Sequence, residues 1–101
     1  MTRILHTLIM TTMLCLTTGQ AQAQGAGIEW KTLNQEVMEL YRTGQYGRAV
    51  TVANAALKVA EQNVGPDHPN VATSLNNLAV LYDTQGDYAK AEPLYKRSLA
   101  I

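Results

Sequence analysis

The chain has few of the residues that build disulfide frameworks or charged binding surfaces. Cys15 is the only cysteine among its 101 residues, so the sequence excludes an internal disulfide framework and any multi-cysteine metal site. The 8 basic and 8 acidic residues give a formal net charge of zero, without the electrostatic footprint of a protein that binds nucleic acid or anionic lipid. At this length we expect one small domain.

The first 23 residues are predicted to form a secretory signal peptide. Arg3 supplies one positive charge, and residues 4–16 form an apolar stretch that is too short to span a bilayer comfortably. The Ala-Gln-Ala triplet at residues 21–23 predicts cleavage directly after it. An uncleaved N-terminal anchor and a mitochondrial-type presequence are the alternatives. We expect an exported protein, periplasmic or secreted, with a short linker over residues 24–29.

The rest of the chain has the apolar periodicity of helices. Spacings of three and four predict four of them, over residues 28–42, 46–62, 69–84 and 88–101. Gly44 and Gly86 are placed to end the first and third helices with a positive φ angle. Pro69 suits the first position of the third helix, where a missing N–H costs nothing.

A shift of 42 residues places the first helix pair on the second. Six residues then coincide in type: Leu33, Asn34, Gly44, Tyr46, Ala49 and Leu57 fall on Leu75, Asn76, Gly86, Tyr88, Ala91 and Leu99. The packing of helix pairs constrains such positions, so this is an internal repeat. In this ungapped register Glu36 falls on Leu78. A first turn one residue shorter would place Val37 on Leu78 instead, and both registers stay open.

The second helix pair resembles the tetratricopeptide repeat. It has the signature residues at the spacing of that motif: Leu75, Leu78, Ala79, Tyr82, Gly86, Tyr88, Ala91 and Tyr95. The 42-residue period is similar to the longer variant found in kinesin light chains. The resemblance implies an all-α fold of antiparallel helix pairs, stacked as a short right-handed α-solenoid. It also implies a divergent first repeat at residues 30–69 and a second at residues 70–101 that stops within a helix.

The resemblance implies a protein-interaction scaffold, because in this family the first helix of each pair lines a concave surface that contacts extended peptides. Its groove-facing positions fall on Thr73, Asn76, Asn77, Val80 and Asp83 in the second repeat, and on Lys31, Asn34, Gln35, Met38 and Tyr41 in the first. Asparagine suits this role because its amide both donates and accepts hydrogen bonds. The cationic clamp that some members use for C-terminal carboxylates is not matched. We interpret Tyr46, Tyr88 and Tyr95 as packing residues.

The sequence offers no convincing catalytic or metal-binding constellation. His68 is the only histidine beyond the predicted signal peptide, and we interpret it as a helix-start residue. Glu36 and Glu39 are three positions apart, but we interpret them as solvated side chains and not as an acid–base pair. Ser74 and Ser98 have no histidine at a spacing that indicates a nucleophile. We therefore expect no enzyme, no cofactor, no nucleic acid and, after signal cleavage, no membrane contact.

Two repeats are fewer than the three or so that such stacks usually need. The predicted last helix leaves Leu94, Leu99 and Ile101 without a later partner. This pattern favours a piece of a longer repeat protein over a native dimer. The alternative function is therefore a structural fragment that binds no peptide and pairs through its exposed last helix.

Overall fold

The structure is a computed structural model that describes residue 25 and residues 27–101. The predicted signal peptide and its cleavage site lie outside the described residues. Within the described part every regular element is a helix. These elements are the first helix, which covers residues 27–42, followed by α2 (Tyr46–Val64), α3 (Pro69–Thr84) and α4 (Tyr88–Leu99). None of them is long and apolar enough to cross a membrane.

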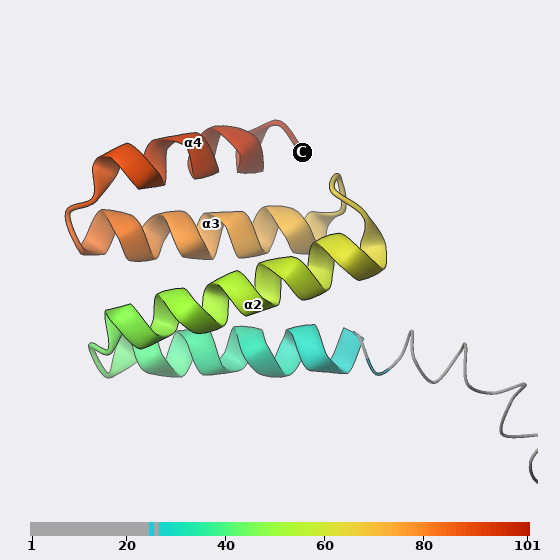
Figure 1. The fold of residues 1–101 in the computed structure, drawn as a ribbon, viewed down its shortest axis with the longest axis horizontal. Helices are drawn as coiled ribbons and strands as arrows, with labels where there is room; N and C mark the ends of the chain where they lie inside the picture. Colours follow the sequence, from blue (N-terminus) through green and yellow to red (C-terminus); the bar gives the residue numbers. More distant parts are fainter. Residues whose placement is uncertain (1–24, 26) are drawn as a thin grey trace, which may run out of the picture.

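Consecutive helices run antiparallel to each other (Figure 1). The first helix also contacts α3, which runs in the same direction. α3 packs against both α2 and α4, so it forms the centre of the stack. The predicted all-α architecture of stacked helix pairs is confirmed for the described residues. The prediction for the last helix was two residues too long, because α4 ends at Leu99. The backbone N–H of Ala100 bonds to the carbonyl oxygens of Lys96 and Ser98 there.

Both tight turns have the same hydrogen bonds at an offset of 42 residues. Gly44 has φ 77° and Gly86 has φ 81°, as predicted for glycines that end helices. The N–H of Gln45 bonds to the carbonyl oxygen of Leu40 at 2.8 Å, and the N–H of Asp87 bonds to that of Tyr82 at 2.8 Å. The ungapped register is therefore correct at the turn, and the shorter first turn is wrong.

A stripe of alanines on α2 lets its neighbours approach closely. Ala49, Ala53, Ala56 and Ala60 are all buried, as their spacing of four, three and four predicts. Ala49 and Ala53 share one core cluster with Val37 and Leu40 of the first helix and with Leu78 and Leu81 of α3. A second cluster joins Ala60 to Val71 and Leu75. The core therefore runs continuously from the first helix pair into the second.

Polar contacts connect the two repeats around this core. The indole Nε1 of Trp30 donates to Ser74 Oγ at 2.7 Å. Within the second repeat, Ser98 Oγ of α4 donates to the carbonyl oxygen of Ala72 of α3 at 3.0 Å. Arg97 of α4 forms an ion pair with Glu61 of α2 at 3.2 Å. Both serine hydroxyls thus have structural partners.

The start of α3 is fixed by the residues that the sequence indicated. Pro69 occupies its first turn, and Nδ1 of His68 accepts a hydrogen bond from the backbone N–H of Asn70 at 3.0 Å. A side-chain acceptor at this position satisfies one of the N–H groups that a helix start leaves without a partner. The interpretation of His68 as a helix-start residue is therefore confirmed.

Two predictions about the last helix need correction. Leu94 is half-buried and packs against both core clusters, because it lies on the side of α4 that meets the rest of the stack. Tyr88 was expected to be a packing residue, but it is 67% exposed because no described element covers that side of α4. Leu99 is 87% exposed for the same reason, as predicted.

Candidate functional site

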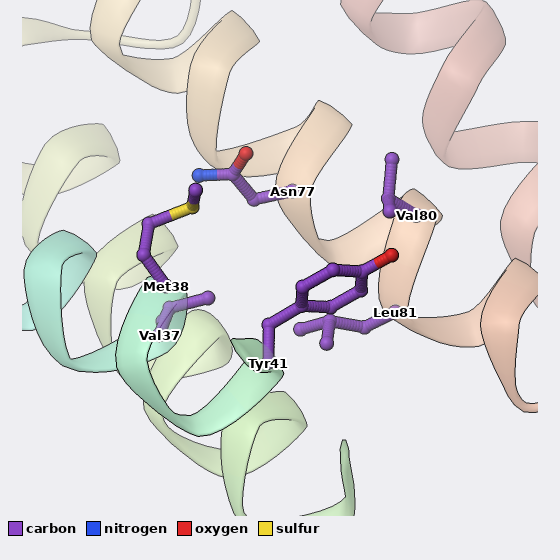
Figure 2. Close-up of a pocket in the computed structure, with 6 residues that line it drawn as sticks. All are labelled: Val37, Met38, Tyr41, Asn77, Val80 and Leu81. Carbon is purple, nitrogen blue, oxygen red and sulfur yellow. The ribbon is translucent and has the colours of Figure 1, made fainter. Parts of the chain in front are cut away.

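A small apolar hollow lies between the first helix and α3. It has a volume of about 160 Å³ and is lined by Val37, Met38, Tyr41, Asn77, Val80 and Leu81. Figure 2 shows Met38 and Tyr41 reaching from the first helix toward Asn77 and Val80 on α3. These four residues belong to the predicted groove-facing set. The structure therefore places groove-facing positions of both repeats around one hollow.

Asn77 forms one polar edge of the hollow. Its Nδ2 donates a hydrogen bond to Oδ1 of Asn34, another residue of the predicted set, at 2.7 Å. The bond fixes the orientation of the Asn77 amide. Oδ1 of Asn77 accepts no hydrogen bond from residues 27–101, so an acceptor remains available beside the apolar lining.

Asp83 lies at the far end of the same side of α3, where Tyr95 of α4 contacts it. The hydroxyl of Tyr95 donates to Oδ2 of Asp83 at 3.5 Å, and Asp83 follows Val80 by three residues, so both lie on one helix face. Burial, together with the negative charge of Asp83, raises the pKa of Tyr95. A carboxylate therefore stands one helical turn beyond the hollow.

Tyr41 is held in place by a second aromatic ring. Its ring meets that of Tyr46 in an edge-on arrangement, with 5.6 Å between centroids and 61° between planes. Such edge-to-face pairs are a favoured geometry for aromatic side chains. Tyr46 is thus a packing residue, as predicted, and it supports the wall of the hollow that Tyr41 forms.

The remaining residues of the predicted set do not line this hollow. Lys31, Gln35, Thr73 and Asn76 are all exposed. Gln35 lies on a more open surface of the first helix, beside Glu39 and Arg42. The hydrogen bond with Glu39, at 2.6 Å, and the charge of that carboxylate raise the pKa of Arg42. Glu39 is therefore engaged with a cation on the surface, and the structure does not pair it with Glu36.

Two lining residues were absent from the predicted set. Val37 and Leu81 are buried core residues that also form the floor of the hollow. Each directly adjoins a predicted residue in the sequence, Met38 and Val80, and that adjacency was the available signal. Within the described residues no group of three His, Cys, Asp or Glu side chains could hold a metal ion.

Comparison with known proteins identifies the family to which most of the helical part of the chain is similar. A family model described as "Tetratricopeptide repeat" matches residues 33–101. Nephrocystin-3 of Xenopus laevis is 38% identical over 69 residues, and Nephrocystin-3 of Homo sapiens is 42% identical over 69 residues. Each match covers 68% of this chain and 5% of the relative. The chain thus spans about one-twentieth of the length of these curated relatives.

Proposed function

Because the chain belongs to the tetratricopeptide-repeat family, we propose that it is a scaffold that binds a segment of a partner protein in the hollow between the first helix and α3. Tetratricopeptide repeats are a scaffold fold without catalytic chemistry, and they generally mediate contacts between proteins. For this chain we propose, in addition, where the partner segment binds and what kind of peptide it is.

The observation that carries the proposal is the position of Asn77. Asn77 lines a hollow that is otherwise almost entirely apolar, and its side-chain carbonyl oxygen accepts no hydrogen bond from the described residues. An extended peptide can donate a backbone N–H to this oxygen and place the neighbouring side chain in the hollow, since successive side chains of an extended chain point to opposite sides. A volume of about 160 Å³ suits one aliphatic side chain. The proposed ligand is therefore an extended peptide with an aliphatic anchor.

The charges near the hollow favour a basic residue next to that anchor. Asp83 has no ion pair with the described residues, whereas Glu39 is already paired with Arg42. A lysine or arginine of the peptide can meet Asp83 one helical turn from Val80. The residues that line the hollow include no lysine or arginine for a free C-terminal carboxylate, so an internal peptide segment is favoured over a chain end.

A displayed peptide library, selected on the full chain, tests this proposal. The selected peptides should share an aliphatic residue with a nearby Lys or Arg. Val80→Glu places a charge in the hollow and should reduce binding of a selected peptide at least about tenfold. Asn76→Ala, next to the hollow but outside it, should leave binding unchanged. Equal binding by both variants, with helicity preserved, would count against the hollow and favour a purely structural role.

We also propose that the protein is exported and cleaved after residue 23. The support is the sequence of residues 1–23, with one charge, a short apolar core and small residues before the cleavage point. N-terminal sequencing of the protein recovered from its producing cells is the direct test. A mature chain that begins at Gln24 supports export, and an intact N-terminus in the cytoplasmic fraction contradicts it.

A further inference from the structure

Met38 is the only sulfur-containing residue among residues 25–101, and it lines the hollow between the first helix and α3. The other sulfur-containing residues of the chain, Met1, Met10, Met13 and Cys15, lie outside the described residues. The proposed cleavage after residue 23 would remove all four of them. Met38 would then supply the only sulfur atom of the mature chain.

The side chain of Met38 is accessible from solvent. Met38 is 55% exposed, and it lines both the hollow and the more open surface that it shares with Gln35, Glu39 and Arg42. It belongs to neither core cluster. An oxidant must touch the thioether in order to react with it, and here a small oxidant can reach the side chain while the fold stays closed.

We infer that Met38 is an oxidation site through which a hydroperoxide lowers the affinity of the hollow for its peptide. The inference rests on the proposed function, because it concerns regulation of the same hollow. With hydrogen peroxide, a lone pair of the sulfur attacks one peroxide oxygen, so that an S–O bond forms and the O–O bond breaks. The sulfur gives up two electrons to the peroxide. The released hydroxide takes the proton of the transferred oxygen, and the products are methionine sulfoxide and water.

Oxidation changes the character of one wall of the hollow. A thioether is apolar, whereas a sulfoxide is polar and chiral and has an oxygen that accepts hydrogen bonds. An aliphatic anchor in the hollow would cover this oxygen and displace its water without offering a donor in return, which is unfavourable. The added oxygen also occupies part of a volume of about 160 Å³ that suits one aliphatic side chain. Both effects act against the proposed ligand.

Asn77 can hold the sulfoxide oxygen inside the hollow. The amide nitrogen of an asparagine carries two hydrogens, and Asn77 uses one of them for the 2.7 Å bond to Asn34. Figure 2 shows the side chain of Met38 reaching toward Asn77 from the opposite wall. The second N–H of Asn77 is therefore a donor for the sulfoxide oxygen. This bond would oppose rotation of the oxidised side chain out to solvent.

The rest of the fold does not depend on this thioether. In the first helix, Val37 and Leu40 supply the buried contacts with the core, and Trp30 and Asn34 supply the hydrogen bonds to α3. Oxidation of Met38 should therefore change the hollow and leave the stack folded. Methionine sulfoxide reductases restore the thioether, with two thiols supplying two electrons and two protons and the oxygen leaving as water. The change is thus reversible.

Peroxide treatment of the full chain tests the oxidation step. Trypsin releases residues 32–42 as one peptide that contains Met38 and no other sulfur, so mass spectrometry can follow the gain of one oxygen there. Because Met38 is exposed, we expect its rate in the folded chain to lie within about threefold of the rate in the urea-unfolded chain. Nuclear magnetic resonance signals of the Val80 methyl groups and the Asn77 side-chain amide should shift, with helicity preserved. Protection of Met38 by more than about tenfold, unchanged Val80 and Asn77 signals, or loss of helicity would overturn the inference.

Peptide binding tests the regulatory step. A peptide selected on the untreated chain should bind the oxidised chain at least about tenfold more weakly. Treatment with methionine sulfoxide reductases and dithiothreitol should restore binding. Met38→Leu removes the thioether, so peroxide should leave the affinity of that variant at its own starting value. A similar loss in peroxide-treated Met38→Leu would place the effect at another residue and overturn the inference.

The outcomes separate this inference from the proposed function. Binding that Val80→Glu weakens but oxidation of Met38 does not would overturn the inference and support the hollow as the peptide site. Failure to select any peptide, or equal binding by Val80→Glu, contradicts the proposed function. The oxidation rate and the signals of Val80 and Asn77 then decide whether Met38 is an oxidation site at the hollow.

Discussion

Asn77 of α3 donates a hydrogen bond of 2.7 Å to Asn34 of the first helix. The two residues are 43 positions apart, although the repeat period is 42 residues. The pair therefore connects non-equivalent positions of the two repeats: the repeat equivalent of Asn34 is Asn76, which is exposed. At this contact the first helix and α3 are therefore staggered by one residue relative to the 42-residue repeat.

This stagger predicts a specific energetic coupling. A double-mutant cycle with Asn34→Ala and Asn77→Ala should give an interaction free energy of about 1 kcal/mol, the net value of a typical side-chain hydrogen bond. Urea unfolding followed by circular dichroism measures it. The matched cycle of Asn34→Ala with Asn76→Ala should give a value near zero. Equal coupling in the two cycles would contradict the observed pairing.

The alanine stripe of α2 predicts a strong dependence on side-chain size. Ala53→Leu adds volume between α2 and α3 at a site that is 2% exposed, so we expect the free energy of unfolding to fall by about 1–3 kcal/mol. Ala55→Leu makes the same change on the exposed side of α2 and should stay within about 0.5 kcal/mol of the original. Thermal unfolding distinguishes the two, and a neutral Ala53→Leu would show that the helices do not pack closely there.

The two glycines around the first turn predict opposite effects of one substitution. Gly44 has φ 77°, so Gly44→Ala should cost about 1–2 kcal/mol of stability through backbone strain alone, since open space surrounds its Cα. Gly47 lies within α2 with open space around it, and Gly47→Ala should add about 0.5 kcal/mol. Chemical denaturation of both variants is the measurement. A stabilising Gly44→Ala would mean that the turn differs from the structure.

The environment of Tyr95 predicts a loss of stability at alkaline pH. Burial and Asp83 raise the pKa of Tyr95 above its usual value of about 10. The unfolded state then releases the phenolic proton at a lower pH than the folded state, so this stabilisation is present below pH of about 10 and declines as pH rises through the folded-state pKa. Ultraviolet titration should show a lower pKa for Tyr95 in Asp83→Asn, with Tyr95→Phe to assign the signal. If Asp83→Asn left the titration curve unchanged, Asp83 would not be a cause of the raised pKa of Tyr95.

The sequence predicts the helices of this protein better than the walls of its hollow. Helix ends follow from local chemistry, since Gly44, Gly86 and Pro69 act within one turn of their own positions. The hollow depends on the offset between the first helix and α3. The only sequence signal for Val37 and Leu81 is that each adjoins a predicted groove residue, and this does not show that a buried core residue also lines a surface hollow.

From the sequence we expected Tyr88 to pack and Leu94 to lack a partner, and both expectations were wrong for a related reason. Both lie on α4, and the apolar pattern alone does not say which side of an outer helix meets the stack. The rest of the molecule decides this, since Leu94 reaches both core clusters whereas Tyr88 faces a side that no described element covers.

Trp30 is the only tryptophan of the chain, and its indole N–H is bonded to Ser74 across the junction of the two repeats. The protein thus contains its own optical reporter at the joint between its repeats. Intrinsic fluorescence should shift when the first helix separates from α3, even if every helix stays intact. Opening of the joint can therefore be distinguished from loss of helix without attaching any label.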